Sequence, residues 1–398
     1  MAAPWNELAF ILASRRGFGE RPARWDTEVV TDERARGYHR IQLGLSLLAF
    51  ALGVGYLSAV LATGASVRLA ARLAEWTARP WLTLAVMALV VGAGWRLVTL
   101  PLSWLSGFWL PRRFGLLHQP FARWAWDAAK AGAIGGVLGL AGVEVVYALL
   151  RWTPWWWLAA AAVFLAAAVL LTLVAPVWLI PLFYRLEPLA DGELRERLLR
   201  LGRRTGVPVL GVWVGDQSRK SRTANAAVTG LGRTRRIILF DTLVRDFPPE
   251  EIEAVLAHEL AHHAHADIWR GLAVQGAVTL ATFWLADRLL AVGASGLGLA
   301  GPADIAGLPL LLLIAVGAGV VALPLTNGWS RHVERQADDF AVRALGSAGA
   351  FIAAMERLAR LNLAEREPHR LKEILLYSHP AIGRRVARAQ ALAAGSVG

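Results

Sequence analysis

Long apolar stretches separated by basic, polar segments dominate the first half of this chain of 398 residues. An apolar run of about 20 residues matches the thickness of a lipid bilayer when it forms a helix. The predicted spanning helices lie at about 41–63, 82–110, 131–150, 155–181, 268–291 and 308–325. We therefore expect a mainly α, polytopic membrane protein with about six transmembrane helices.

The segment between the fourth and fifth spans has a different pattern. Residues 191–204 carry apolar positions at helical spacing, which predicts an amphipathic helix. Residues 207–214, 223–230 and 235–240 predict three strands, with a Gly-containing turn between the last two. A further helix is expected at 249–266, because prolines mark its start and glutamates fill its first turn. This pattern indicates a small cytosolic α+β lobe.

These elements divide the chain into alternating membrane and cytosolic parts. A short interfacial helix is predicted at 5–12, and the sixth span is expected to end before Asn327, with soluble charged helices after it. We expect an N-terminal segment, four spans, a first part of the lobe, two spans and a second part of the lobe. Their respective ranges are 1–40, 41–184, 185–267, 268–326 and 327–398.

Composition agrees with a membrane protein and excludes several functions. The chain is 56% hydrophobic and has 18 Trp, many of them at the ends of apolar blocks, where an amphipathic ring suits the lipid headgroup layer. Its net charge of +12 comes with no nucleic-acid-binding motif, so we expect basic loops facing anionic lipid and no nucleic-acid partner. The absence of Cys excludes disulfides, thiol catalysis and a Cys-type zinc site.

The distribution of Lys and Arg predicts the orientation. The segment before the first span, the loop at 111–130 and the predicted lobe are basic, whereas the loop at 292–307 has no Lys or Arg. The positive-inside rule therefore places the lobe and both termini in the cytoplasm, with the chain in the inner (plasma) membrane. The loop at 64–80, which carries three Arg, does not fit this orientation.

The helix predicted at 249–266 contains an HExxH motif at 258–262. His258 and His262 are four residues apart, so they lie on one face of the helix and can both reach one tetrahedral Zn²⁺. Glu259 is placed to act on a metal-bound water as general base. The alternative is the polar face of a surface helix that happens to carry two histidines.

Two further histidines lie close to the motif. His263 points away from the ligand face, and His265 lies about 10 Å along the helix axis from His258 at 1.5 Å per residue. We therefore expect both to be polar surface histidines outside the metal site.

A zinc ion held by two histidines needs a third ligand and an open position for water. Glu334 and Asp338, just after the sixth span, lie four residues apart on one helical face. Glu334 is the expected third ligand, and Asp338 is expected to accept a hydrogen bond from a ligand imidazole. The alternative is an exposed helix in which Arg331 and Arg335 pair with these carboxylates.

A second candidate cluster lies at 377–385 and contains His379 and Arg385. Peptide hydrolysis builds negative charge on the carbonyl oxygen, and an imidazole or guanidinium placed there lowers the barrier. Both residues are therefore expected to take part in catalysis. The alternative is a histidine before a proline in a surface loop.

The motifs HELAH, SRHVERQADDFA and YSHP, with Arg385 six residues after His379, resemble those of the type I CAAX prenyl protease family. HtpX-type membrane proteases are more distant relatives of that family. The resemblance covers roughly residues 95–390, with the motifs in the same order and at similar intervals. It implies an integral-membrane, gluzincin-like protease with a water-filled chamber inside its ring of helices.

The resemblance also implies roles for individual residues. One Zn²⁺ per chain is bound by His258, His262 and Glu334, with Glu259 as the base. His379 and Arg385 stabilise the tetrahedral intermediate or hold the substrate. The strand near Asn225 and Ala226 lies beside an extended peptide substrate, which fits the physics of strand addition at a sheet edge.

The expected function is that of a zinc metalloendopeptidase acting on peptides or membrane proteins, and a monomer is compatible with this function. The Ala- and Arg-rich composition favours a bacterial source, and hence quality control or processing of membrane proteins over maturation of prenylated proteins. Eukaryotic members have an additional N-terminal span, but residues 1–40 contain no such apolar run, so we expect six spans. The alternatives are a transporter or scaffold, for which Arg96 and Glu144 inside spans argue, and an inactive binding relative.

Overall fold

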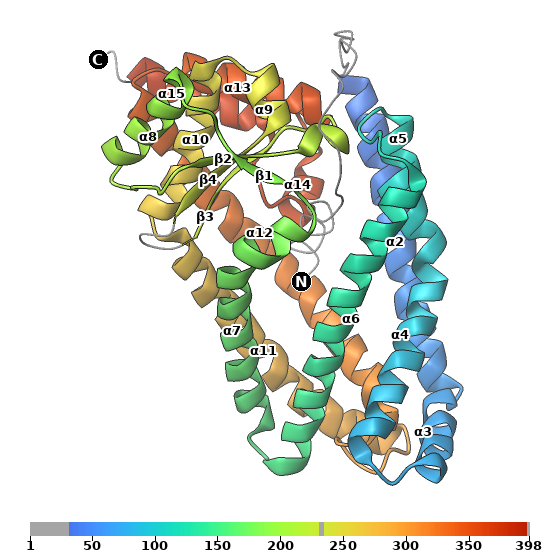
Figure 1. Cartoon of the computed structure of the whole chain (residues 1–398). Coiled ribbons are helices and arrows are strands. Elements are labelled where there is room, and N and C mark those ends of the chain that lie inside the picture. Colours follow the sequence, from blue (N-terminus) through green and yellow to red (C-terminus); the bar gives the residue numbers. More distant parts are fainter. Residues whose placement is uncertain (1–31, 231–234, 396–398) are drawn as a thin grey trace.

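The structure is a computed structural model that describes residues 32–230 and 235–395. A bundle of long helices carries, at one end, a lobe built around a small sheet (Figure 1). The helix expected at 5–12 lies outside the described residues, as does most of the expected N-terminal segment.

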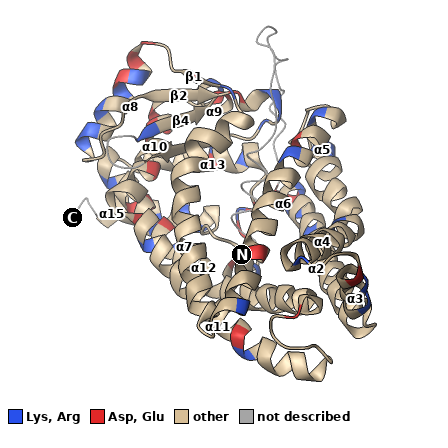
Figure 2. Cartoon of the chain, turned by 60° about the horizontal axis from the view of Figure 1, so that its bottom comes forward, with Lys and Arg blue, Asp and Glu red and all other residues tan. Residues whose placement is uncertain are grey.

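Six helices among the described residues are long and apolar enough to cross a membrane, as predicted. Five of them are longer than their predicted apolar runs, because charged and polar turns extend them beyond the bilayer thickness, and the fourth has the predicted length of 27 residues. Charged residues gather on the lobe and near the ends of these helices (Figure 2). The spans are α2 (Asp32–Ala62), α4 (Pro80–Trp104) continued by η1 (Leu105–Trp109) and α5 (Leu110–Arg113), α6 (Phe121–Trp152), α7 (Trp156–Val174) continued by η2 (Ala175–Leu179) and η3 (Ile180–Leu182), α11 (Asp267–Gly296) and α12 (Leu308–Leu345).

The helix that forms the sixth span continues past Asn327, whereas the end of the span itself before this residue stays a prediction. The helix α12 continues without interruption to Leu345 and carries Glu334 and Asp338 into the lobe. Asn327 is buried, and its side-chain amide donates to the Leu375 carbonyl at 2.8 Å, so it serves a tertiary contact instead of ending the helix. One rigid helix therefore joins the membrane to the candidate site.

The predicted basic loop at 64–80 contains a helix, α3 (Ala65–Trp76). Arg68 and Arg72 lie on this short amphipathic helix, at the end of the bundle opposite the lobe (Figure 1), and Arg79 directly precedes α4. Gly64 turns the chain into this helix with φ 67°, and Arg68 donates to the Thr63 carbonyl at 2.7 Å.

The lobe contains a four-stranded sheet in the order β1-β2-β4-β3. The central strands β2 and β4 are parallel, and each pairs with an antiparallel outer strand. The predicted strand at 207–214 starts later than expected, and the short β1, which ends in a proline, was not predicted. The strands are β1 (Leu186–Pro188), β2 (Val212–Gly215), β3 (Ala226–Thr229) and β4 (Arg236–Phe240).

One face of the sheet packs against helices and forms the main apolar core. Val212, Ile237 and Leu239 from the strands meet Leu256 and Leu260 from the helix that carries HExxH, and all five are almost fully buried. This core anchors the HExxH helix against the sheet. The remaining elements of the lobe are α8 (Glu193–Arg204), η4 (Gln217–Arg219), α9 (Asp241–Asp246), α10 (Pro249–Ala264), α13 (Gly349–Asn362), α14 (Arg370–Leu376) and α15 (Ile382–Gly395), and η6 (Ile305–Gly307) precedes α12.

Candidate active site

The helix α10 presents the HExxH motif between the lobe core and α12. Pro249 occupies its first turn beside two glutamates, and Ala266, with φ 56°, turns the chain sharply after its end. Because residues four apart share a helical face, His258 and His262 point toward the same neighbour, with ring centroids 4.9 Å apart. That neighbour is α12.

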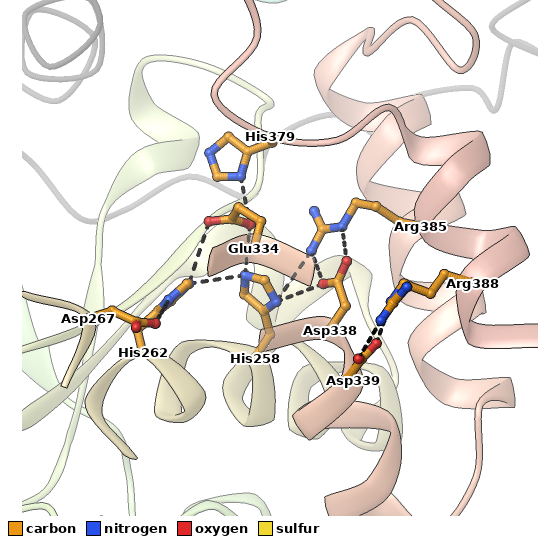
Figure 3. A network of polar contacts seen from close by, with 9 residues as sticks. All are labelled: His258, His262, Asp267, Glu334, Asp338, Asp339, His379, Arg385 and Arg388. Carbon is orange, nitrogen blue, oxygen red and sulfur yellow. Dashed lines mark hydrogen bonds and ion pairs between the residues drawn. The ribbon is translucent and has the colours of Figure 1, made fainter. Parts of the chain in front are cut away.

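The helix α12 brings Glu334 between the two imidazoles (Figure 3). The Glu334 carboxylate lies 3.2 Å from Nε2 of His258 and 3.5 Å from Nε2 of His262. The two Nε2 atoms are 3.3 Å apart. The structure thus brings together three residues that are separated by a transmembrane hairpin in the sequence.

The spacing of the two imidazole nitrogens fits a tetrahedral zinc ion. Zinc bound at about 2.0–2.1 Å to nitrogen and oxygen requires neighbouring ligand atoms about 3.3 Å apart. The two Nε2 atoms, 3.3 Å apart, match that value, and the Glu334 carboxylate offers Oε2 to His258 at 3.2 Å and Oε1 to His262 at 3.5 Å. One ligand atom from each of the three residues lies within 4.8 Å of the other two. Two imidazoles and one carboxylate are also a common set of ligands for catalytic zinc, which keeps a fourth position open for water.

Asp338 lies one helical turn after Glu334 and contacts the other nitrogen of His258. Its Oδ1 atom is 2.9 Å from Nδ1 of His258, so Nδ1 can donate and leave Nε2 free to bind a metal. Arg385 donates to both oxygens of Asp338, at 2.6 and 2.9 Å. Both side chains are less than 10% exposed, which makes this a buried ion pair behind His258.

The electrostatics of the site depend on these carboxylates. Burial disfavours the charged imidazolium of His258, but hydrogen bonds with Asp338 and Glu334 outweigh burial and raise its pKa to about 9. Burial raises the pKa of the Glu259 carboxyl above its ordinary value, although His258 and His262 act in the opposite direction. A carboxylate with a raised pKa suits proton transfer near neutral pH.

Asp267 supports the second histidine and was not identified from the sequence. Its Oδ2 atom lies 3.0 Å from Nδ1 of His262, and Arg270 holds its other oxygen at 2.7 Å. The contact depends on the left-handed turn at Ala266, which folds the start of α11 back toward α10. Periodicity within one helix gives no signal for such a contact.

His379 approaches the site from the loop between α14 and α15. Its Nδ1 atom lies 2.8 Å from Glu334, and its side chain is 49% exposed. Arg331 of α12 fixes this loop by donating to the carbonyls of Glu373 and Tyr377 at 2.9 and 2.6 Å. His379 therefore faces the open side of the site, whereas Arg385 lies on its buried side.

A cavity of about 300 Å³ lies beside Glu259. It separates the HExxH helix from α13 and from the loop that carries His379. Its wall is largely apolar, with polar groups where it meets the candidate metal ligands. The cavity is lined by Ala224, Asn225, Val255, His258, Glu259, Met355, Leu358, Ala359, Asn362, Ala364, Glu365, Tyr377, His379, Pro380, Ala381, Ile382 and Arg385.

The strand β3 forms one edge of the sheet beside this cavity, with Asn225 directly before it and Ala226 as its first residue. The Phe240 N–H donates to the Asn225 carbonyl, so Asn225 faces β4 and the next residue, Ala226, faces outward. The outward Ala226 N–H donates to the side-chain oxygen of Asn225 at 2.8 Å. Asn225 is exposed, whereas Ala226 is 4% exposed and packs in the lobe core.

His263 is not a surface histidine, contrary to the prediction. Its side chain is buried, and Nε2 donates to the Val228 carbonyl of β3 at 2.8 Å. It points away from the metal ligands, as expected, but it ties the HExxH helix to the edge strand. His265 is half-buried against the ring of Phe340.

Two family models match this chain. One, described as peptidase family M48, covers residues 188–393. The other, described as CAAX prenyl protease N-terminal, five membrane helices, covers residues 24–185. The resemblance to CAAX prenyl proteases drawn from the motifs is confirmed.

Individual proteins agree with these matches. The chain is 30% identical over 299 residues to the uncharacterized metalloprotease YhfN of Bacillus subtilis (strain 168), covering 74% of this chain and 70% of the relative. It is 38% identical over 176 residues to CAAX prenyl protease 1 of Saccharomyces cerevisiae, covering 42% and 37% respectively. The crystal structure of S. mikatae Ste24p has the same fold, with a TM-score of 0.79, 23% identity, and coverage of 97% of this chain and 96% of that one.

Proposed function

This chain belongs to peptidase family M48, and we propose that it is a zinc-dependent membrane endopeptidase in which His258, His262 and Glu334 hold the zinc ion. The observation that carries this proposal is the convergence of two imidazoles and one carboxylate, a ligand set of catalytic zinc, with one ligand atom from each within 4.8 Å of the other two. The family membership removes the support for a transporter or scaffold as the main function.

When bound, zinc supplies the Lewis acidity that makes water nucleophilic near neutral pH. Glu259 accepts a proton from the attacking water and returns it to the leaving amine. His379, on the open side of the site, donates to the carbonyl oxygen as it gains negative charge. The contacts of Arg385 favour a different role from the one expected: it holds Asp338, which orients His258.

The substrate is a peptide or a membrane protein that enters as an extended strand along β3, past Asn225 and Ala226. The lobe and both termini lie in the cytoplasm, and the spans lie in the inner membrane. Processing or quality control of membrane proteins fits a bacterial member better than maturation of prenylated proteins. The spans and the lobe described in one chain are compatible with a monomer.

The decisive test separates metal binding from chemistry. Glu259→Gln should retain stoichiometric zinc by elemental analysis but lose cleavage of an unfolded or membrane-tethered peptide, because the amide cannot accept the proton. A chelator should abolish cleavage by the unmodified protein. Full activity of the Gln variant would contradict the mechanism.

The third ligand is tested separately. Glu334→Ala should lower the zinc content, since only two protein ligands would remain. Undiminished stoichiometric metal in this variant would remove Glu334 from the ligand set.

A further inference from the structure

The second face of the sheet points toward the lobe-side end of the α7 span and is partly apolar. Trp213 of β2 pairs with Ile238 of β4, so both lie on one face, and Arg236 shares it because it is two residues before Ile238. The opposite face, with Ile237 and Leu239, packs into the lobe core. Sheets with one buried face commonly present a polar second face to water, which this one does not.

Between this face and the lobe-side end of α7 is a cavity of about 760 Å³, which we call the underside cavity. Figure 1 shows the sheet above the end of α7. Val177, in the cavity wall, is 56% exposed, and its neighbour Trp178 is 72% exposed. The cavity is lined by Leu173, Pro176, Val177, Pro181, Tyr184, Arg185, Leu186, Glu187, Trp213, Thr229, Gly230, Arg236 and Ile238.

Two arginines supply positive charge to the underside cavity. Arg236 lies over the ring of Trp213, 5.1 Å from its centroid, and Arg185 follows the end of the spanning segment. Among residues 32–230 and 235–395, neither guanidinium has an ion-pair partner. The one acidic residue of the lining, Glu187, is exposed, so the lining has a net charge of +1.

We propose that the underside cavity binds the glycerophosphate headgroup of an anionic phospholipid from the leaflet on the lobe side. Guanidinium groups bind phosphate through paired, charge-assisted hydrogen bonds, and Arg185 and Arg236 present two of them. The wall formed by Leu173 and Val177 is continuous with the lipid-facing surface of α7 and accepts the start of an acyl chain. Trp213 provides the amphipathic ring that suits this depth.

The lipid also lies beside Thr229 and Gly230, at the end of the edge strand β3. A bound headgroup therefore fills the space between the membrane and the strand that faces the candidate active site. Because the cavity is separate from the metal ligands, its occupancy does not depend on the proposed function.

The test is native mass spectrometry of the full-length, delipidated protein in detergent, titrated with phosphatidylglycerol. Arg185→Gln/Arg236→Gln should weaken the first lipid-binding step about tenfold, because two charged contacts to phosphate are lost. Arg185→Lys/Arg236→Lys should recover part of the affinity, since charge is kept but paired geometry is not. Unchanged melting temperatures without lipid would show that the variants fold.

A matched control distinguishes this site from a generally basic membrane surface. Arg113 and Arg123 are exposed arginines at the same end of the bundle, and Arg113 lies 5.9 Å from the Trp109 ring centroid. Arg113→Gln/Arg123→Gln should change lipid affinity less than twofold. Equal weakening in both double variants would contradict the proposal.

Inorganic phosphate and the deacylated headgroup, glycerophosphoglycerol, separate a lipid from a soluble anion. Neither compound should displace phosphatidylglycerol at concentrations at which that lipid saturates the site, because the acyl chain contributes to the affinity of the lipid. If either compound competes at the same concentration as phosphatidylglycerol, the cavity binds a soluble phosphate and the proposal of a lipid site is wrong. Repeating the titration with Glu259→Gln should give the same affinities, whatever the fate of the proposed activity.

Discussion

Each of the two histidines of the candidate metal site contacts a carboxylate that pairs with an arginine, but the two ion pairs differ in their exposure to solvent. His258 contacts Asp338, which Arg385 holds, and both charged side chains are less than 10% exposed. His262 contacts Asp267, which Arg270 holds, but the Arg270 side chain is 33% exposed. Each imidazole is thus oriented by a carboxylate that is itself held by an arginine.

This difference in exposure determines how much each carboxylate–arginine pair contributes to the free energy of unfolding. A buried charge that loses its partner is left uncompensated at low dielectric, which is strongly destabilising. An arginine that reaches water can be solvated when its partner is removed, so the cost is small. The His258 side should therefore determine both folding and metal binding, whereas the His262 side should mainly tune the metal.

Asp338→Ala should have the largest effect. It leaves Arg385 buried without a carboxylate and removes the acceptor for Nδ1 of His258. We expect a loss of about 3–5 kcal/mol in the free energy of unfolding and at least tenfold weaker zinc binding. Denaturant unfolding in detergent and elemental analysis measure the two effects.

Asp339 offers a matched control next to Asp338. It forms a similar two-oxygen pair with Arg388, at 2.6 and 2.7 Å, but contacts neither histidine, and the Arg388 side chain is 45% exposed (Figure 3). Asp339→Ala should therefore leave zinc content unchanged and cost at most about 1 kcal/mol. Equal losses of unfolding free energy in Asp338→Ala and Asp339→Ala would contradict the expected difference between the buried and the partly exposed ion pair.

Asp267→Asn should affect the metal more than the fold. The amide keeps the size of the side chain but lowers the basicity of the acceptor for His262. We expect zinc affinity to fall about tenfold, with a change in unfolding free energy below about 1 kcal/mol. Competition with a chromogenic chelator measures the affinity, and unchanged zinc affinity would exclude Asp267 as a support for His262.

The pH dependence of the metal-free protein sharpens the comparison further. Because the pKa of His258 is raised to about 9, the folded protein binds the proton of this imidazole more tightly than the unfolded chain does. The resulting stability is fully present below the ordinary value of 6.5 and is lost as pH rises through 9. The melting temperature of the metal-free protein should therefore fall over this range relative to that of Asp338→Asn, in which a neutral amide replaces the carboxylate. Parallel pH profiles would contradict this account.

Arg270→Gln should have the smallest effect. Its contacts with Asp267 and Gln336 lie at the partly exposed side of the site. We expect a change in unfolding free energy within about 0.5 kcal/mol and peptide cleavage within about twofold of the unmodified protein. A loss as large as that of Asp338→Ala would show that exposure does not govern these pairs.

The fold was predictable where information is local. Apolar runs indicated six spans, and all six are present among the described residues, because bilayer thickness sets the length of a spanning helix. The small sheet was harder to predict: β1 has three residues, and its pairing with β2 depends on distant contacts. The length of α12 was also not evident from the sequence, because the tertiary contact of Asn327 overrides the weak local preference of an Asn-Gly pair.

The sequence by itself determined the chemistry of the candidate metal site. The four-residue spacing of HExxH places His258 and His262 on one face in any straight helix, and the same spacing places Asp338 one turn beyond Glu334. These are properties of 3.6 residues per turn, and they need no other part of the molecule.

Only the tertiary structure decided which further groups contact the metal ligands and the residues that support them. Arg385 turns toward Asp338, Asp267 reaches His262, and His263 bonds to the edge strand β3. The arginine contact joins elements far apart in the chain, and the other two depend on a sharp turn and on packing across the sheet. Their directions are set by how helices and strands pack, which periodicity along the sequence does not encode.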